Sequence, residues 1–177
     1  MNKIIIFLVL IFILFFFFYF KPKYTQSAPQ TQEATDILLT VNNRIRILCN
    51  NLSEHIDEYP KFKPYILVLC KKIDKLRIKE TPYNEKHTSY TINKGEISLC
   101  LRSKDTGQFH DINLIMYVVL HELSHVICPD KDHTQLFKEI FVFLLERAID
   151  LGIYEKTNYQ KTPHEYCGMT IRENILK

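Results

Sequence analysis

Apolar residues recur at helical spacing in the first half of the folded part of this chain. From Thr35 onward they follow alternating three- and four-residue steps, at Leu38, Val41, Ile45, Leu48 and Leu52. This spacing predicts one apolar stripe along a long helix. A helix–helix dimer seam is the alternative, but packing on the domain core is the better interpretation because two to three heptads are short for a coiled coil. After Pro60 and Pro64, a shorter helix is predicted over Tyr65–Ile73.

Two further helices are predicted in the second half of the chain. Residues 112–127 are almost continuously apolar, and Asp111 before them can cap the exposed amides of the first turn. Pro129 ends this helix, since the residue before a proline is pushed out of the helical conformation. The last long helix is predicted over Thr134–Leu151. Its apolar positions share one face, and they are Phe137, Ile140, Phe141, Leu144, Leu145 and Ala148.

A β-hairpin is predicted between the two pairs of helices. Thr88–Ile92 is rich in β-branched and aromatic residues, Asn93–Glu96 is a turn signal, and Ile97–Arg102 reads as the returning strand. The tail from Tyr154 to Lys177 has no clear periodicity. These elements predict an α+β fold, with a long packing helix, a small β-hairpin or sheet, a central apolar helix and a C-terminal helix.

The amino-terminal region predicts a membrane anchor. Residues 4–20 are an unbroken apolar run, which is just long enough to cross a thin bilayer at about 1.5 Å per residue. The alternative is a signal peptide, but Ser27-Ala28 followed by Pro29 is a poor cleavage site. We therefore predict a transmembrane anchor over residues 1–23, a tether over residues 24–34 and one folded domain over residues 35–177.

Composition and cysteine usage bear on partners and compartment. The chain has 46% hydrophobic and 24% charged residues, and its net charge of +3 is too small and too scattered to predict nucleic-acid binding. Its five cysteines form no C-x-x-C pair, and most have apolar neighbours, where a free cysteine behaves as a small hydrophobe. We therefore expect free thiols, a reducing compartment and a single-pass membrane protein whose folded domain lies in the cytosol.

The predicted helix 112–127 contains an H-E-x-x-H sequence, formed by His121, Glu122 and His125. The two histidines are one turn apart, so both can bind one tetrahedral Zn²⁺. Glu122 lies about 100° around the helix from His121, where its carboxylate can accept the proton of a metal-bound water. The alternative is a pair of hydrogen-bonded core histidines beside a paired glutamate. The apolar setting favours zinc, because ionisable groups in a buried helix need partners or a metal.

A catalytic zinc usually has a third protein ligand. His133 lies just beyond Pro129, where a short connection between two helices can return it to the metal. Glu146 is the rival, but helical geometry points it away from the apolar face of its helix. We therefore predict His133 as the third ligand. Asp130 and Asp132 either orient a ligand imidazole or are simply solvated. The remaining histidines show no ligand spacing, and they are His55, His87, His110 and His164.

The zinc motif resembles a known family. The H-E-x-x-H sequence of His121–His125, followed by an H-x-x-x-F sequence at His133–Phe137, resembles the minimal SprT-like and Wss1-like metallopeptidases. The resemblance is specific at the zinc site and loose elsewhere. Thr134 stands where SprT-like enzymes have a glycine, and no DNA-binding extension is visible. A role in repairing DNA crosslinks is therefore not implied.

Other segments are similar to predicted metallopeptidases of large nucleocytoplasmic DNA viruses. They are Thr88–Gly95, Leu99–Arg102, His110–Asn113 and Tyr166–Met169, and with the zinc motif the resemblance covers roughly residues 88–171, about half of the chain. With its predicted anchor, the chain is also similar to a small asfarvirus virion membrane protein. The resemblance implies a class of chemistry rather than a particular substrate.

A zincin-like fold is what the resemblance implies. Strand 97–102 would then lie beside the motif helix and offer a free edge to an extended substrate. Tyr166 would either donate its hydroxyl to the developing oxyanion or be an ordinary packed aromatic. The resulting hypothesis is a membrane-anchored zinc peptidase acting on a protein or peptide. The alternative is a non-catalytic interaction or structural protein that keeps the fold. Glu122 favours the enzyme, because a structural zinc site needs no general base.

Overall fold

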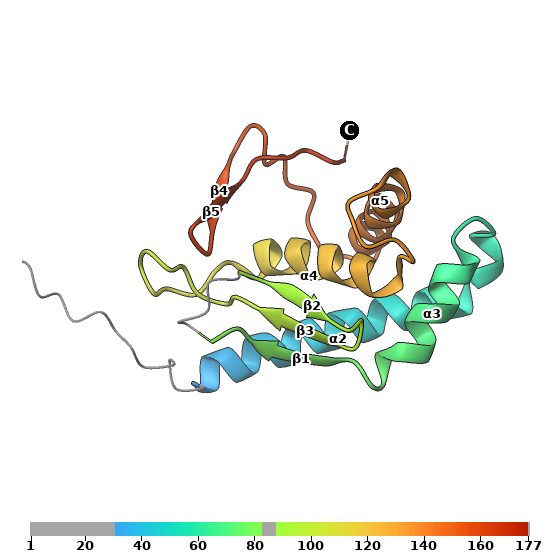
Figure 1. The fold of residues 1–177 in the computed structure, drawn as a ribbon, viewed down its shortest axis with the longest axis horizontal. Helices are drawn as coiled ribbons and strands as arrows, with labels where there is room; N and C mark the ends of the chain where they lie inside the picture. The colour runs from blue at the N-terminus through green and yellow to red at the C-terminus, as the bar shows by residue number, and fades with distance from the viewer. Residues whose placement is uncertain (1–30, 83–87, 177) are drawn as a thin grey trace, which may run out of the picture.

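The computed structural model describes residues 31–82 and 88–176. Within these residues the fold is α+β, with four α-helices, a three-stranded sheet and a two-stranded hairpin (Figure 1). In chain order, the elements are α2 (Gln32–Glu54), the 3₁₀ turn η1 (Ile56–Glu58), α3 (Lys63–Ile73), β1 (Arg77–Glu80), β2 (Tyr90–Ile92), β3 (Glu96–Leu99), α4 (Ile112–Ile127), α5 (Gln135–Asp150), β4 (His164–Tyr166) and β5 (Met169–Ile171).

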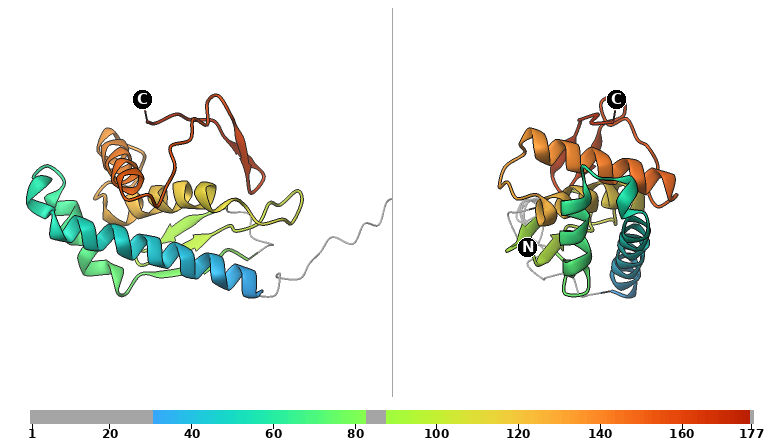
Figure 2. Two further views of the ribbon diagram at one scale, coloured as in Figure 1. Left: turned by 180° about the vertical axis from the view of Figure 1, so that it is seen from behind. Right: turned by 90° about the vertical axis from the view of Figure 1, so that its right-hand side faces the viewer.

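The helices gather on one face of the three-stranded sheet. The strand order is β1-β3-β2, with β3 parallel to β1 and antiparallel to β2. Helix α2 packs against β1, whereas α4 packs against β2 and β3. Helix α5 lies on the far side of α4 from the sheet, and the β4–β5 hairpin lies towards the amino-terminal half of α4 (Figure 2). Helix α4, which carries the H-E-x-x-H sequence, is therefore enclosed on several sides.

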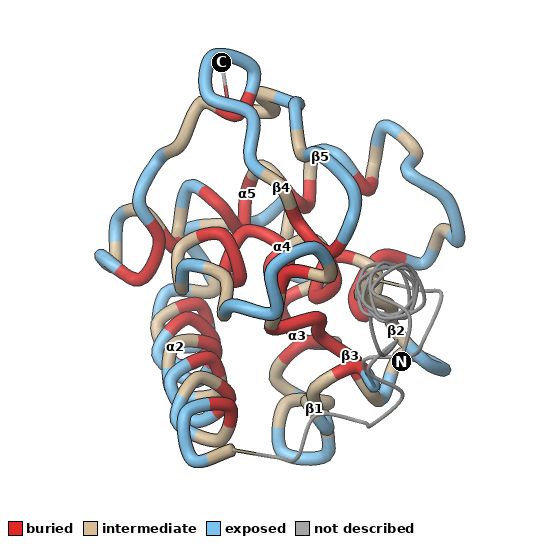
Figure 3. Tube along the Cα trace, turned by 90° about the vertical axis from the view of Figure 1, so that its left-hand side faces the viewer, coloured by how far each residue is buried: buried red, intermediate tan, exposed pale blue. Residues whose placement is uncertain are grey.

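Burial follows the predicted apolar patterns. The stripe of α2 faces the core along its whole length, as Figure 3 shows, and the interpretation that it packs on the domain core is confirmed. Burying a single aliphatic side chain of this size stabilises the fold by about 1.5–3 kcal/mol. Asp111 caps α4 as predicted, because its carboxylate accepts hydrogen bonds from the amides of Asn113 at 2.8 Å and Leu114 at 3.4 Å.

The predicted free edge of strand 97–102 is wrong. Strand β3 is the middle strand of the sheet, and it pairs with β1 on one side and with β2 on the other. The unexpected neighbour is β1, whose four residues Arg77–Glu80 include one apolar side chain and so give no strand signal. β2, rather than β3, is the outer strand beside α4.

The β4–β5 hairpin was also not predicted. Its two-residue turn consists of Cys167 and Gly168, with φ of 53° and 81°. Two consecutive positive φ values are typical of a type I′ turn, which most often contains Asn-Gly or Asp-Gly. A cysteine before the glycine hides this signal in the sequence.

The amino-terminal prediction needs correction. Residues 4–20 lie outside the described residues, and within residues 31–82 and 88–176 none of the helices has the length and apolar character needed to cross a bilayer. A transmembrane helix in the fold class and a single-pass membrane localisation are therefore not supported. Helix α2 begins at Gln32, so the last residues of the predicted tether belong to the folded domain.

The prediction of free thiols throughout is also wrong. Cys100 and Cys167 form a disulfide with a Cα–Cα distance of 6.4 Å, which ties the β4–β5 turn to the end of β3. In the chain-entropy picture, closing a loop of this length stabilises the fold by about 4 kcal/mol. Cys49, Cys70 and Cys128 are free. The disulfide removes the support for a reducing compartment, since apolar neighbours alone do not distinguish a buried thiol from a buried disulfide.

Candidate metal centre

Three histidine rings meet where α4 and α5 cross. His121 and His125 lie one turn apart on α4, and His133 precedes α5. Nε2 of His133 lies 3.0 Å from Nε2 of His121 and 3.1 Å from Nε2 of His125. The structure thus brings the three predicted ligands together as a group that could hold a metal ion. Glu146, the rival ligand, is exposed on α5 and is not part of this group.

The spacing of the three nitrogens fits a metal better than it fits hydrogen bonding. A neutral imidazole has one N–H donor and one acceptor nitrogen, so Nε2 of His133 cannot serve both neighbours equally. In a tetrahedral zinc site with Zn–N distances of about 2.0–2.1 Å, ligand nitrogens lie about 3.3 Å apart. The observed 3.0 and 3.1 Å are close to this value. A small outward shift of the rings would admit the ion.

Phe137 supports all three rings. Its ring centroid lies 5.0 Å from that of His121, 4.3 Å from that of His125 and 4.7 Å from that of His133. The first turn of α5 holds Phe137 in place, because Thr134 Oγ1 accepts a hydrogen bond from its amide. The Asp130 carboxylate, which was a candidate partner for a ligand imidazole, accepts a hydrogen bond from Thr134 Oγ1 and so anchors the start of α5.

Burial keeps two of the candidate ligand histidines neutral. Desolvation, reinforced by the neighbouring histidines, lowers the pKa of His121 to about 3. Desolvation also lowers the pKa of His125 to about 4, and the electrostatic interactions with His133 and Lys94 act in the same direction. A metal ligand must present a neutral imidazole. These two histidines are therefore ready to bind a cation across the physiological pH range.

Acidification is expected to destabilise the metal-free protein. The folded-state pKa values of His121 and His125 lie below the ordinary value of 6.5, so the unfolded chain binds protons that the folded chain does not. Their stabilising contribution is complete above pH 6.5 and is lost as the pH falls towards 4. The Tm of the metal-free protein should therefore decrease over this range. The decrease should be shallower in His121→Gln, and equal slopes would contradict the prediction.

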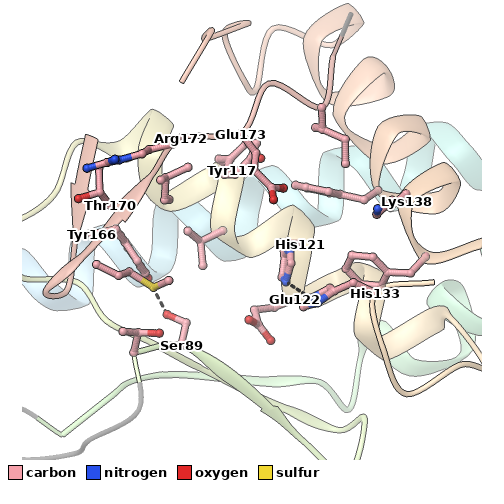
Figure 4. A pocket seen from close by; sticks show the side chains of 17 residues that line it. Ser89, Tyr117, His121, Glu122, His133, Lys138, Tyr166, Thr170, Arg172 and Glu173 are labelled. Carbon is pink, nitrogen blue, oxygen red and sulfur yellow. Dashed lines mark hydrogen bonds between the residues drawn. The ribbon is translucent and has the colours of Figure 1, made fainter. Parts of the chain in front are cut away.

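Glu122 lies beside the histidines, and a residue of the sheet holds its carboxylate in place through a hydrogen bond. It is 6% exposed, and its Oε2 accepts a hydrogen bond of 2.7 Å from Thr91 Oγ1 on β2. Burial raises the pKa of Glu122, which makes the carboxylate a stronger base, whereas the Thr91 hydrogen bond opposes this rise. In Figure 4 the carboxylate lies below the paired rings of His121 and His133. Sequence reasoning missed Thr91, because no local pattern links a strand residue to a helix residue 31 positions later.

A cavity of about 490 Å³ opens beside the cluster. His121, Glu122 and His133 line it on one side, and the segment Met169–Arg172 lines it on another, as Figure 4 shows. Much of the remaining wall is aromatic or aliphatic, with Tyr117, Val118, Phe137, Phe141 and Ile175. The arrangement suits a mostly apolar group held next to the candidate metal ligands.

Tyr166 lines the same cavity. Its hydroxyl lies 2.6 Å from Ser89 Oγ. Ser89 Oγ accepts a hydrogen bond from the amide of Cys100 at 2.9 Å. If Ser89 donates its hydrogen to the tyrosine oxygen, the phenolic hydrogen is free for a group in the cavity. Burial raises the pKa of Tyr166, so the phenol stays protonated. The geometry is compatible with both of its predicted roles, hydroxyl donor and packed aromatic.

His110 belongs to a second cluster. Its Nε2 lies 3.5 Å from Cys167 Sγ, and its ring centroid lies 4.9 Å from that of Tyr166. Together with Cys100 it completes a second group of potential metal ligands. Spacing along the chain gave no hint of this group, since it joins the end of a strand, a loop and a hairpin turn. His55 and His164 lie in neither cluster, and His87 is outside the described residues.

Comparison with known proteins found viral relatives. Protein R325 of Acanthamoeba polyphaga mimivirus is 50% identical over 158 residues, which cover 89% of this chain and 80% of R325. Protein 136R of Invertebrate iridescent virus 6 is 42% identical over 80 residues, 44% of this chain and 45% of 136R. Protein 042R of Invertebrate iridescent virus 3 is 46% identical over 71 residues, 40% of this chain and 45% of 042R.

These relatives carry no functional description, since each is named an uncharacterized protein. No protein-family model matches the chain, and no solved structure matches it. The resemblance to SprT-like peptidases therefore stays a prediction. The match to R325 extends along most of both proteins at half identity, so this chain belongs to the same family as the mimivirus protein R325.

Proposed function

We propose that this protein is a zinc-dependent peptidase, in which His121, His125 and His133 hold the ion and Glu122 is the general base. The observation that carries the proposal is the convergence of three Nε2 atoms next to a cavity that His121, His133 and the buried Glu122 line. Structural zinc sites usually have four protein ligands, whereas catalytic sites have three and keep a position open. A purely structural site would also have no use for Glu122.

Each residue of the proposed site has a separate role in the hydrolysis. Zinc, when bound, would polarise the scissile carbonyl and lower the pKa of a water molecule to about 7. Glu122 takes the proton of the attacking water and then delivers it to the leaving amine. Thr91 orients the carboxylate through Oε2 and leaves Oε1 available for that proton. Tyr166 is the candidate donor to the oxygen that becomes negatively charged.

The substrate would approach along β2. This strand is the outer strand of the sheet on the side of α4, and it carries Thr91, which contacts Glu122. An extended peptide can bind to such a strand through main-chain hydrogen bonds. An apolar side chain next to the scissile bond would then occupy the cavity beside His121 and Phe141. Protein or peptide is therefore the proposed substrate class.

Incubation of the full zinc-loaded chain with a broad peptide library tests this proposal. Cleavage should appear in some pools, disappear after treatment with a zinc chelator and return when one equivalent of zinc is added. A folded, zinc-containing chain that cleaves no pool would contradict the proposal and favour a non-catalytic interaction protein.

Loss of the Thr91 hydroxyl should slow hydrolysis, because it removes the contact that orients the Glu122 carboxylate. In Thr91→Val, the shape is kept but the hydrogen bond to the Glu122 carboxylate is lost. A hydrogen bond to a charged group contributes about 1.5–3 kcal/mol, so kcat/KM should fall about 10- to 100-fold. Zinc content should not change. Thr91→Ser is the matched control, because it keeps the hydroxyl and should retain most of the activity. Equal losses in both variants would argue against this role.

A further inference from the structure

A second cluster of metal-binding side chains lies at the junction of β3, the loop before α4 and the β4–β5 turn. Its members are Cys100, His110 and Cys167, whose ligand atoms all lie within 4.8 Å of one another. Both cysteines are almost fully buried, and His110 is partly buried. The mechanism proposed above uses none of these three side chains, although Cys167 directly follows Tyr166 in the chain.

The geometry of the cluster fits a zinc ion when the sulfurs are thiolates. In a tetrahedral site with Zn–S of about 2.3 Å and Zn–N of about 2.0–2.1 Å, sulfur and nitrogen lie about 3.6 Å apart. The distance from Cys167 Sγ to His110 Nε2 is 3.5 Å. The two sulfurs must separate to about 3.8 Å to bind the same ion. Their Cα atoms are 6.4 Å apart, towards the wide end of the usual disulfide range of about 4.4–6.8 Å, so a modest side-chain rotation is sufficient.

The surroundings also accommodate the reduced cysteines. Sγ of Cys100 and Sγ of Cys167 each lie 3.2 Å from the carbonyl oxygen of Arg102. A disulfide sulfur has no hydrogen to donate to this oxygen, whereas a thiol does. Burial lowers the pKa of His110, so its imidazole is neutral and able to bind a metal. Thiolate and imidazole ligands together are typical of zinc sites.

We propose that Cys100, His110 and Cys167 form a second zinc site when the Cys100–Cys167 disulfide is reduced. Two molecules of a thiol reductant supply two electrons and two protons to the S–S bond and leave as their own disulfide. Zinc then displaces the two thiol protons, binds both thiolates and the neutral imidazole, and takes a water as its fourth ligand.

The disulfide and the proposed zinc site would each hold the same parts of the fold together. The disulfide links the end of β3 to the β4–β5 turn, and the zinc would link the same two points and add the loop before α4. Tyr166, next to Cys167, therefore stays at the wall of the cavity in both states. The reduced chain without zinc would lose this crosslink.

Zinc content measured against redox state tests the proposal. The full chain carrying His133→Ala is suitable, because that substitution removes a ligand of the first site and leaves the second cluster intact. The outcome therefore does not depend on the proposed peptidase. The oxidised variant should bind little zinc, and after reduction by a phosphine it should bind one zinc per chain. Cobalt in place of zinc should give sulfur-to-cobalt charge-transfer absorption only in the reduced protein.

A ligand variant and a control variant, both made in the His133→Ala background, test which side chains bind the second zinc. His110→Ala keeps the disulfide, so it can fold before reduction, and it should weaken zinc binding at least about 100-fold, since even indirect partners of a ligand contribute 10- to 100-fold. Cys70→Ser removes a free cysteine outside the cluster and should leave the zinc gain unchanged.

Any of the following results would overturn the proposal. One is a chain whose thiols are shown by alkylation to be reduced but which gains no zinc. The second is a disulfide that resists the phosphine in the folded protein, or a chain that unfolds on reduction although zinc is present. The third is a full zinc gain in His110→Ala.

Discussion

Glu122→Gln is expected to abolish most peptide hydrolysis while leaving zinc and the fold in place. The amide has nearly the size of the carboxylate, and its oxygen can still accept the hydrogen bond from Thr91. It cannot take a proton from water, and a positioned general base contributes about 10²- to 10⁴-fold to the rate. We therefore expect kcat/KM for the best library peptide to fall by this factor.

Zinc content and Tm give the controls for Glu122→Gln. Burial disfavours the charged form of Glu122 and raises its pKa, so a neutral amide should not lower the Tm. Glu146→Gln is the matched variant, because it makes the same chemical change at an exposed position on α5. It should behave as wild type. If Glu122→Gln cleaves as fast as wild type with zinc present in both, Glu122 is not the general base.

His133→Ala is expected to release zinc. Only two protein ligands would remain on α4, and a ligand that is bound directly should contribute at least the 10- to 100-fold in affinity typical of its indirect partners. Elemental analysis of the oxidised, purified protein should show zinc in the wild type and little in this variant. Added zinc should raise the Tm of the wild type only, since an ion that binds the folded state stabilises it.

The rival ligand set is tested by the same measurement. Glu146→Ala should keep its zinc, because Glu146 is exposed and lies outside the histidine group. Loss of zinc from Glu146→Ala, together with full occupancy in His133→Ala, would reverse the assignment of the third ligand.

Local patterns were sufficient for those parts of the site that lie within one helix. The separation of His121 and His125 follows from helical periodicity, and Asp111 caps α4 because its position before the apolar run is a local feature. His133 required one more step, the short connection after Pro129 that returns the chain to α4. These features depend on neighbours in sequence, which hydrophobic spacing and turn chemistry describe well.

The features that were missed depend on contacts between distant residues. Thr91 reaches Glu122 from β2, and Cys100 meets Cys167 across a separation of 67 residues. Spacing along the chain does not say which strand lies beside which helix, so neither contact could be inferred. The short β1 contains one apolar residue and is stabilised by pairing with β3. The transmembrane prediction rested on the apolar run of residues 4–20 and on the poor cleavage site after it, and no helix within the described residues supports it.

Anomalous diffraction at the zinc absorption edge tests the proposed centre most directly. Crystals of the oxidised, zinc-loaded chain should show one strong anomalous peak, about 2.0–2.1 Å from Nε2 of His121, His125 and His133. The carboxylate of Glu122 should lie near the ion without binding it. A peak at another position with these three imidazoles unbound, or an ion bound directly by Glu122, would contradict the proposed zinc centre.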